Sequence, residues 1–240
     1  MYNSFAKVYD RLTDDVDYDR IFQYVEKIFA KYQVKPELVL ELACGSGNFT
    51  KRLVDSGYDV IGIDSSVEML DIAKEKCPQA LLLQQDMTDF ELYGTVDAII
   101  CILDGVNYVT DKRKLRRMFK WVENYLNPEG IFIFDINSEY KLKNVIGNNT
   151  FIRSEDDIFY SWENELENDR VHFYLTFFNR EGDKYERFEE IHTERIYKTD
   201  EIKEIIESSG MKILGVFPEY KFTEVSKKDE RIFFVARKNS

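Results

Sequence analysis

The chain has 240 residues, and its 45 acidic and 33 basic side chains give a formal net charge of −12. A surface this acidic repels phosphate backbones, so nucleic acid is not expected as a partner. The hydrophobic content of 44% and the aromatic content of 15% are sufficient for a sizeable core. The length fits one α/β domain that carries an insertion.

The three cysteines, Cys44, Cys77 and Cys101, are widely spaced and form no C-x-x-C pair. This pattern predicts neither a metal site nor a disulfide framework, and it favours a reducing cytoplasm. Residues 1–5 do not resemble a signal peptide, and no apolar run approaches the length of a membrane span. No membrane association is therefore expected.

Apolar residues in the first 150 positions alternate between helical and strand periodicity. The expected helices cover residues 17–32, 48–57, 65–77 and 111–126. The expected strands cover residues 38–43, 60–64, 80–84, 96–103 and 131–136. Strands that alternate with helices form a parallel, doubly wound sheet, and right-handed crossovers fix most of its topology.

Ligands of such sheets bind beyond the carboxyl ends of the strands, near the point where the strand order reverses. In this chain those ends are expected at Cys44, Asp64, Asp86, Leu103 and Asp135. Polar residues and small residues therefore gather at the one edge of the sheet where a ligand site is expected.

The pattern changes between residues 148 and 197, where short alternating segments are separated by turn residues. Antiparallel strands are expected at 151–159, 160–167, 171–179 and 184–197. A helix at 200–209 and strands at 211–217 and 232–237 follow. We expect residues 1–150 and 198–240 to form the core. Residues 151–197 then form an antiparallel β insertion that presents aromatic side chains to the ligand site: Tyr160, Trp162, Phe173, Tyr174 and Phe178.

The stretch from Leu38 to Thr50 is a short apolar strand, a glycine turn and the start of a helix. Gly45 and Gly47 match the first two glycines of the dinucleotide fingerprint G-x-G-x-x-G, and Asp64 lies at the distance of its ribose-binding acid. Thr50 replaces the third glycine. A nicotinamide-dependent oxidoreductase is one alternative, but Thr50 and the terminal strand pair argue against it. Glu41, inside the strand, suits a cationic amino-acid ligand better than a pyrophosphate.

Three segments together resemble class I S-adenosylmethionine-dependent methyltransferases. They are Glu41-Leu42-Ala43-Cys44-Gly45-Ser46-Gly47, Gly62-Ile63-Asp64-Ser65-Ser66-Val67-Glu68-Met69-Leu70 and Gln85-Asp86-Met87. Their order and spacing match the family. The overall layout is similar to the small-molecule group that includes sugar amine and glycine N-methyltransferases.

The resemblance implies a Rossmann-like sheet of seven mostly parallel strands. It also implies an enzyme that transfers a methyl group from S-adenosylmethionine to an N or O atom of a small molecule. A module that binds the cofactor without transferring a methyl group is the alternative from a different functional class. A monomer or a homodimer is expected.

The resemblance also implies residues for each part of the cofactor. The glycine turn approaches the amino-acid portion, Asp64 accepts from the ribose hydroxyls, and Asp86 accepts from the adenine amino group. A lid over about residues 1–32 contributes tyrosines, the insertion at 151–197 is the expected acceptor platform, and the loop after the fourth strand borders the sulfonium. The implied cofactor-binding residues are Tyr9, Tyr18, Glu41, Ala43, Gly45, Gly47, Asp64, Ser65, Met69, Asp86, Met87 and Leu103.

The loop after the fourth strand supplies the acceptor-side candidates Asp104, Asn107 and Tyr108. In the group that this chain resembles, a histidine occupies this loop. The matching residue here is Asn107, which cannot take a proton at neutral pH. The two histidines of the chain, His172 and His192, fall on expected insertion strands, where we expect them at the strand surface.

Overall fold

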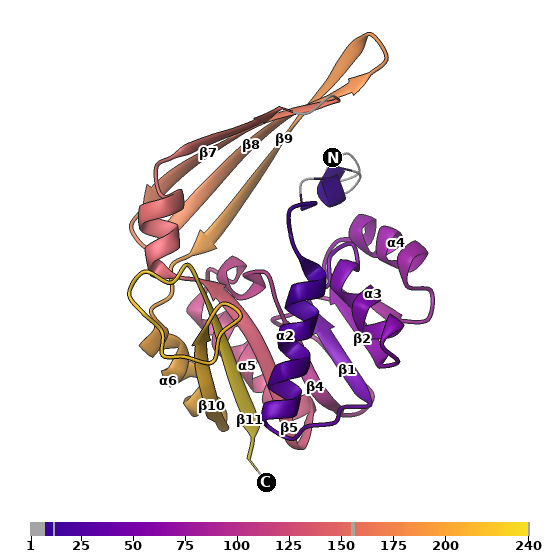
Figure 1. Cartoon of the computed structure of the whole chain (residues 1–240), viewed down its shortest axis with the longest axis vertical. Helices are drawn as coiled ribbons and strands as arrows, with labels where there is room; N and C mark the ends of the chain where they lie inside the picture. The colour runs from indigo at the N-terminus through magenta and orange to yellow at the C-terminus, as the bar shows by residue number, and fades with distance from the viewer. Residues whose placement is uncertain (1–7, 12, 155–156, 240) are drawn as a thin grey trace.

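The computed structural model describes residues 8–11, 13–154 and 157–239. It contains a seven-stranded sheet covered by helices and a four-stranded antiparallel sheet that extends from one end of it (Figure 1). The large sheet has the strand order β10-β11-β5-β4-β1-β2-β3. Its strands are β1 (Leu38–Leu42), β2 (Asp59–Asp64), β3 (Leu81–Gln84), β4 (Val96–Cys101), β5 (Leu126–Asn137), β10 (Met211–Pro218) and β11 (Arg231–Lys238).

The first five strands run parallel, whereas β11 is antiparallel to both of its neighbours, β5 and β10. This topology confirms the predicted fold class, including the terminal antiparallel pair. The fourth strand ends at Cys101 rather than Leu103, because Leu103 and Asp104 have positive φ angles. The fifth strand begins at Leu126 and includes the expected turn at 127–130, where Glu129 has a φ of 64°.

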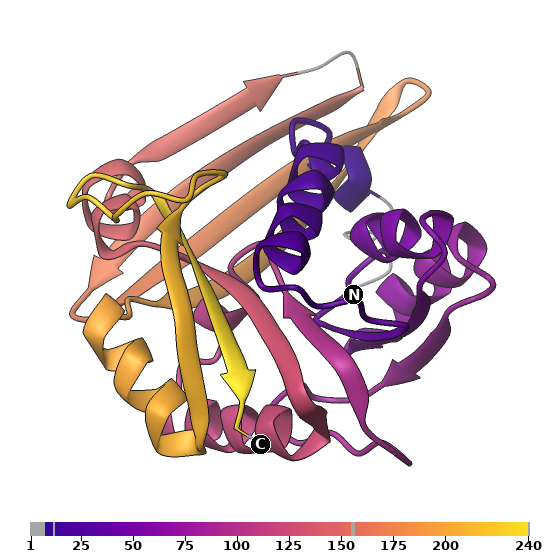
Figure 2. The same ribbon diagram turned by 60° about the horizontal axis from the view of Figure 1, so that its bottom comes forward.

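Helices cover both faces of the large sheet (Figure 2). Successive residues of a strand point to opposite faces, and β4 shows the consequence. Ile100 packs with Val25 of α2 on one face, and Ile99 packs with Phe119 of α5 on the other. Both isoleucines are fully buried, which explains why this strand is an uninterrupted apolar run. The helices are α2 (Tyr18–Lys31), α3 (Asn48–Asp55), α4 (Val67–Lys76), α5 (Lys112–Tyr125) and α6 (Thr199–Ser209).

Side-chain caps mark the start of several helices. Asp17, Ser66 and Asp111 each accept a hydrogen bond from a backbone amide in the first turn of α2, α4 and α5, which satisfies a donor that the helix itself leaves unpaired. Helix α3 differs, because Gly47 precedes it with a φ of 79° and no side-chain cap. The first turn of α3 therefore faces the candidate site without a competing side chain.

The four-stranded sheet consists of β6 (Thr150–Ser154), β7 (Ile158–Glu167), β8 (Arg170–Glu181) and β9 (Lys184–Arg195). The first two strands are divided differently from the prediction, which placed one strand over 151–159. One face of this sheet, called the inner face below, packs against the π-helical segment η2 (Lys141–Ile146) through Val171 and Phe173. Farther along the same face, Phe177 packs against Val8 near the N-terminus.

The predicted aromatic set does not lie on one face of the insertion. Tyr160 and Trp162 pair across the strands with Phe177 and Leu175, which places them on the inner face with Phe173. Tyr174 and Phe178 alternate with these residues and therefore lie on the outer face. The prediction was wrong for these two, because it grouped residues by type and not by the two-residue period of a strand.

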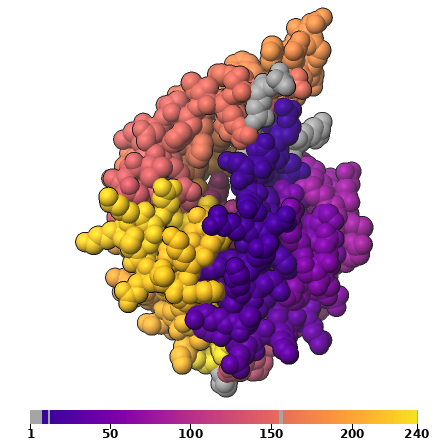
Figure 3. Space-filling view, in the orientation of Figure 1, coloured from indigo at the N-terminus to yellow at the C-terminus, as the bar shows by residue number. Residues whose placement is uncertain are grey.

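The expected lid segment has two parts with different environments. Helix α2 packs on the large sheet, with Val25 and Ile28 fully buried, so it belongs to the core layer. Residues 8–11 are helical and lie beneath the inner face of the four-stranded sheet. In the space-filling view the N-terminal part of the chain connects the two sheets along one side of the molecule (Figure 3). Among the described residues, no helix is long and apolar enough to cross a membrane.

Candidate active site

The glycine turn after β1 combines positive φ angles with a close approach between helices. Gly47 has a φ of 79°, and a Cβ atom there would lie 2.8 Å from the Cβ of Ala73 in α4. Gly45 has a φ of 53°, and a Cβ there would meet no atom within 4 Å. Ala43 also has a positive φ, 55°. The two glycines adopt this backbone without a steric penalty, whereas Ala43 is strained and lines the candidate cleft, as is common at functional sites.

Glu41 of β1 is buried, with 3% of its surface exposed. Thr50 donates a hydrogen bond to its Oε2 at 2.5 Å. Burial raises the pKa of Glu41 to about 8, the hydrogen bond from Thr50 opposes this, and the charge of Asp64 adds to it. A carboxyl group in this setting is stabilised in its charged form by a nearby cation, so it fits the ammonium group of an amino-acid ligand. Thr50, which departs from the glycine fingerprint, supplies the donor to this carboxyl.

Asp64 ends β2 and joins the glycine turn to α4. Its Oδ2 accepts from the Gly45 amide at 2.8 Å, and its Oδ1 accepts from the Ser66 amide at 2.9 Å. Each carboxylate oxygen can accept a second hydrogen bond. The two backbone contacts therefore fix the carboxylate and leave acceptor capacity for a pair of hydroxyls.

A cleft of about 350 Å³ opens beside Asp64. Six of the predicted site residues line it: Ala43, Asp64, Ser65, Asp86, Met87 and Tyr108. Asp86 also accepts a hydrogen bond from the Thr88 amide at 2.8 Å, which closes a local turn. Met69 is 9% exposed within α4 and does not line this cleft.

The turn after β4 is held by a buried carboxylate. Leu103 and Asp104 have consecutive left-handed φ angles of 57° and 56°. Asp135 of β5, 1% exposed, accepts from the Leu103 amide at 2.7 Å and from the Asp104 amide at 3.1 Å. Left-handed backbone is costly for residues with a Cβ atom, so the two hydrogen bonds stabilise a conformation that the turn would not adopt alone.

Arg231, the first residue of β11, completes this arrangement. Its Nη2 donates to Oδ1 of Asp104 at 2.8 Å, and its Nη1 forms an ion pair with Asp135. Burial opposes the charge of Arg231, but the carboxylates of Asp135 and Asp104 prevail and raise its pKa. Sequence analysis missed Arg231, because nothing local marks a residue that lies 127 positions from its partner.

Asn107 belongs to the short 3₁₀ helix η1 (Gly105–Tyr108) and is fully buried. Its Nδ2 donates to the carbonyl oxygens of Asn137 at 3.3 Å and Arg195 at 3.0 Å, and its Oδ1 accepts from the Asn137 amide at 3.0 Å. The side chain thus joins η1 to the end of β5 and to β9. A contact between Asn107 and the acceptor stays a prediction.

The predicted lid tyrosines occupy two places. Burial raises the pKa of Tyr9, and the charges of Tyr18, Asp104 and Asp64 raise it further, so the Tyr9 hydroxyl lies within electrostatic range of both carboxylates. Tyr18, 8% exposed, packs in the core. Burial raises the pKa of Tyr18, while a hydrogen bond with Asn48 lowers it. A contact between Tyr9 and the acceptor stays a prediction, and Tyr18 lies near Asn48, next to the glycine turn.

A polar cluster, called the Asp10 latch below, connects the N-terminal segment to the glycine turn. Asp10 accepts hydrogen bonds from Ser46 Oγ at 2.6 Å and Asn48 Nδ2 at 2.9 Å, and it pairs with Lys76 Nζ of α4 at 2.6 Å. Partial burial opposes the charge of Asp10, but the hydrogen bonds from Lys76, Ser46 and Asn48 lower its pKa. Sequence analysis did not single out any of these residues.

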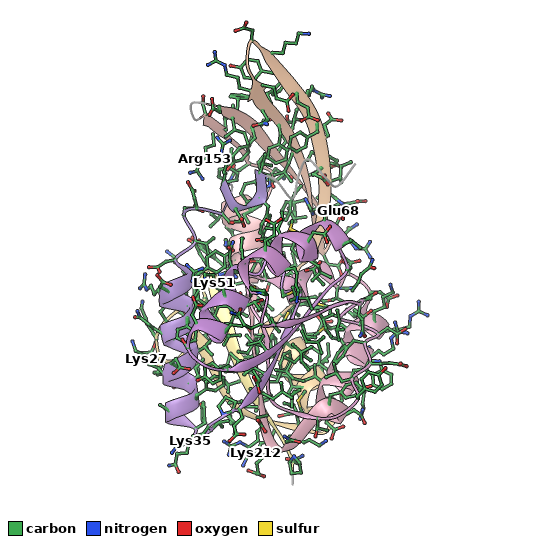
Figure 4. All side chains as sticks on the ribbon, turned by 90° about the vertical axis from the view of Figure 1, so that its right-hand side faces the viewer. Lys27, Lys35, Lys51, Glu68, Arg153 and Lys212 are labelled. Carbon is green, nitrogen blue, oxygen red and sulfur yellow. The ribbon has the colours of Figure 1, made fainter. Side chains whose placement is uncertain are left out.

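A second contact links the N-terminal segment to the four-stranded sheet. Arg153 of β6 donates to Asp14 at 2.8 Å, and Figure 4 shows Arg153 close to the N-terminal segment. The segment is therefore attached both to the cofactor side, through Asp10, and to the insertion, through Asp14.

The two histidines lie on opposite faces of the four-stranded sheet. His172, on the outer face, hydrogen-bonds through Nδ1 to Thr193 Oγ1 at 3.0 Å. His192, on the inner face, is half-buried, and its ring lies edge-on to the ring of Tyr108 at 5.9 Å. His192 is thus not at the outer strand surface where it was expected. Among the described residues, no group of His, Cys, Asp and Glu side chains is placed to hold a metal ion.

The sheet order, the glycine turn and the acid at the end of β2 define a class I methyltransferase fold with a cofactor site. The family model described as a methyltransferase domain matches residues 39–130. The chain is 35% identical over 245 residues to YqeM of Bacillus subtilis (strain 168), which carries a methyltransferase name. The match covers 100% of this chain and 98% of that protein. The chain belongs to this family of S-adenosylmethionine-dependent methyltransferases.

Solved structures agree with the family assignment. The crystal structure of an S-adenosylmethionine-dependent methyltransferase from Clostridium acetobutylicum ATCC 824 is 37% identical and has a TM-score of 0.92, covering 100% of this chain and 99% of that chain. The sugar N-methyltransferase KedS8 from Streptoalloteichus has a TM-score of 0.83 at 17% identity, covering 97% and 93%, which shows the shared fold. The predicted enzyme class, the cofactor and the resemblance to small-molecule methyltransferases are confirmed.

Proposed function

We propose that this methyltransferase acts on an N or O atom of a small-molecule acceptor. The observation that carries the proposal is the cover over the acceptor side of the site. The inner face of the four-stranded sheet packs against η2 and Val8, and the Asp10 latch attaches the same N-terminal segment to the glycine turn. An enclosed site suits a small acceptor and excludes water. The fold shared with a sugar N-methyltransferase supports this proposal.

The residues of the site fit the parts of S-adenosylmethionine. We propose that Glu41 binds its ammonium group, the backbone at Gly45 its amino-acid portion, and Asp64 the two ribose hydroxyls. Asp86 and the Met87 amide are proposed to bind the adenine. When bound, the cofactor supplies a methyl group activated by a positively charged sulfur. Reaction then requires the protein to hold the acceptor in line with that methyl group.

On the acceptor side, Asp104 and Tyr108 are proposed to contact the acceptor. Asn107 is proposed to hold the loop that carries them in position. Asn107 holds η1 between β5 and β9, so it fixes the place of Tyr108. The aromatic inner face of residues 151–197, chiefly Tyr160 and Trp162, is proposed as the surface that selects the acceptor.

We further propose that the enzyme is cytoplasmic, is a monomer or a homodimer, and has no nucleic-acid partner. The net charge of −12 supports the last part, because phosphate backbones are repelled by an acidic surface.

The test is methyl transfer from labelled S-adenosylmethionine to a panel of small amines, alcohols and carboxylic acids. An Asp64→Ala variant serves as the cofactor-site control, and calorimetry measures cofactor binding independently. Transfer to at least one acceptor, with cofactor binding weakened in the variant, supports the proposal. Tight cofactor binding without transfer to any member of the panel would favour a cofactor-binding module instead.

A further inference from the structure

One face of β9 carries three titratable side chains toward the site. Glu190, His192 and Glu194 are two residues apart, so all three lie on the inner face of the four-stranded sheet. His192 pairs across the strands with Phe173, which packs inward with η2. Ile191, between them on the opposite face, is 68% exposed. This part of β9 thus adds two acids and one imidazole to an inner face that is largely aromatic and aliphatic and also holds the buried Asn164.

This face of β9 reaches the cofactor cleft through one aromatic ring. The ring of His192 contacts that of Tyr108 edge-on, at 5.9 Å and 82°, and Tyr108 lines the cleft beside Asp64. The register of β9 is fixed next to this contact, because Asn107 Nδ2 donates to the Arg195 carbonyl at 3.0 Å. His192 is therefore held one side chain away from the cofactor cleft.

Two carboxyl groups from different elements meet at the ends of β5 and β11, because Glu194 bonds to Asn137 and Asp104 bonds to Arg231, which pairs with Asn137 across the two strands. Glu194 is 3% exposed and accepts from Asn137 Nδ2 at 2.9 Å. Burial raises the pKa of Glu194 well above its ordinary value, and the charge of Asp104 raises it further, while Lys141 and Arg231 oppose the shift. The upward shift persists despite these two cations, so a cationic ligand would stabilise Glu194 in its ionised form.

We propose that Glu194 and Asp104 bind the ammonium group of an amine acceptor and that His192 removes its proton before methyl transfer. This inference rests on the proposed small-molecule methyltransferase function and assigns its acceptor class. An ammonium nitrogen has no lone pair, so it cannot receive a methyl group until a base takes one proton. Asn107 cannot serve as that base, whereas His192 lies two residues from Glu194 on the same face of β9.

The proton step balances without any further reactant. One N–H bond of the ammonium breaks, and its electron pair stays on nitrogen as a lone pair. The proton bonds to the unprotonated ring nitrogen of His192, which becomes an imidazolium ion and later loses the proton to solvent. The freed lone pair of nitrogen then forms the bond to the methyl carbon. The carbon–sulfur bond breaks at the same time, and the electron pair of that bond stays on sulfur.

The surroundings of His192 agree with this role. Its packing neighbours are Tyr108 of η1 and Phe173 of β8, and the acids on its own strand face are Glu190 and Glu194. Burial lowers the pKa of His192, which keeps the imidazole neutral and able to accept a proton near pH 7.

The first test uses the two histidine ring signals in nuclear magnetic resonance spectra. The full chain is saturated with S-adenosylhomocysteine, as judged by calorimetry, and titrated with methylammonium or with methanol as its neutral counterpart. His172→Gln assigns the signals. We expect methylammonium to shift the His192 signals and leave those of His172 unmoved, and we expect methanol to have no effect. Glu194→Gln should abolish the shift.

Equal shifts with methanol and methylammonium, or no shift of His192 with either probe, would overturn the amine-binding subsite. Failure of S-adenosylhomocysteine to bind is a separate result, because it would contradict the proposed methyltransferase site itself before the amine is added. The two failures are therefore distinguishable.

The second test measures the pH dependence of turnover with the amine acceptor that the labelled-donor panel identifies. His192→Asn should lower kcat by about 100-fold near pH 7, with recovery as the pH rises and the amine loses its proton to solvent. His172→Asn, the matched control on the outer face, should leave kcat and its pH profile unchanged. An unaltered pH profile in His192→Asn, or transfer only to hydroxyl acceptors, would contradict the proposal.

Discussion

Glu41 shows how a single buried carboxyl group links stability to ligand binding. The residue is enclosed in the central strand and accepts one hydrogen bond from Thr50. Its native pKa of about 8 lies above the ordinary value of 4.5. Between these two pH values the native state holds a proton that the unfolded state releases, so the contribution of Glu41 to stability falls as the pH rises. The buried carboxyl of Glu41 therefore lowers the stability of the fold near neutral pH, at the position where a cation is expected to bind.

Glu41→Gln is accordingly expected to increase the free energy of unfolding at pH 8 by about 1 kcal/mol or more, since one pKa unit corresponds to about 1.4 kcal/mol. The variant should also weaken S-adenosylmethionine binding at least about tenfold, a loss of about 1.4 kcal/mol. Urea unfolding at pH 5 and pH 8, together with calorimetry, checks both effects. The exposed Glu37, changed to Gln, is the control. A variant with unchanged stability and unchanged affinity would show that Glu41 has neither role.

At the scale of elements, the N-terminal segment is positioned by polar contacts at both of its ends. Asp10 attaches it to the glycine turn and α4, and Asp14 attaches it to β6. Both ion pairs are partly exposed, so each adds little to overall stability. We expect the two ion pairs to slow the opening of the N-terminal segment and to have little effect on the melting temperature.

Lys76→Met removes the cation of the Asp10 latch and should speed the dissociation of S-adenosylmethionine several-fold, with little change in melting temperature. Lys74→Met is the matched control, because Lys74 lies on the same helix and donates only to the Pro78 carbonyl in the hydrogen bonds observed for it. Stopped-flow displacement of the bound cofactor measures the rate. Equal dissociation rates in the two variants would mean that the Asp10 latch does not help to retain the cofactor.

Elements whose contacts are local in sequence were predicted well. The glycine turn, β2 and Asp64 lie within 30 residues of one another, and their residue types follow from backbone geometry and capping. The strands of the insertion were recognised, but the faces of their side chains were not, because the prediction grouped aromatic residues by type, whereas adjacent residues of a strand point to opposite faces. Tyr174 and Phe178 were misplaced for this reason.

Contacts between distant segments were beyond sequence reasoning. Asp10 with Lys76, Arg231 with Asp104 and His192 with Tyr108 each join parts of the chain that no periodicity connects. The residues themselves are ordinary surface types, and only the fold shows that they are partners. The loop after β4 and the insertion were both predicted for the acceptor side, but the contacts of that loop with Asp135 of β5, Arg195 of β9 and Arg231 of β11 were not.

At the scale of the whole molecule, Arg231 connects the last strand of the sheet to the turn after β4. Its side chain is 13% exposed and lies between Asp104 and Asp135. Removing one partner of a buried ion pair leaves an uncompensated charge. Loss of Arg231 should therefore affect both the sheet and the acceptor side of the site.

Arg231→Met is expected to lower the free energy of unfolding by about 3–5 kcal/mol and to reduce methyl transfer more than cofactor binding. Arg237→Met, in the same strand but with a more exposed side chain that donates to the Tyr32 carbonyl, should cost less. Urea unfolding and cofactor calorimetry compare the two variants. Similar losses of stability and of methyl transfer in the two variants would mean that Asp104 and Asp135 do not need the charge of Arg231.

The place of β11 in the sheet also has a consequence for the order of events during protein synthesis. β11 follows every other strand of the large sheet along the chain, yet it lies between β5 and β10 and is the strand that joins β10 to the rest. On the ribosome, β10 and α6 emerge before the strand that seats β10 in the sheet. A nascent chain that lacks β11 already contains β1 and β2 with the cofactor-side residues, whereas Arg231, which pairs with Asp104, has not yet been made. Ribosome-bound chains that stop short of residue 231 are thus expected to retain the cofactor but to lack methyl transfer.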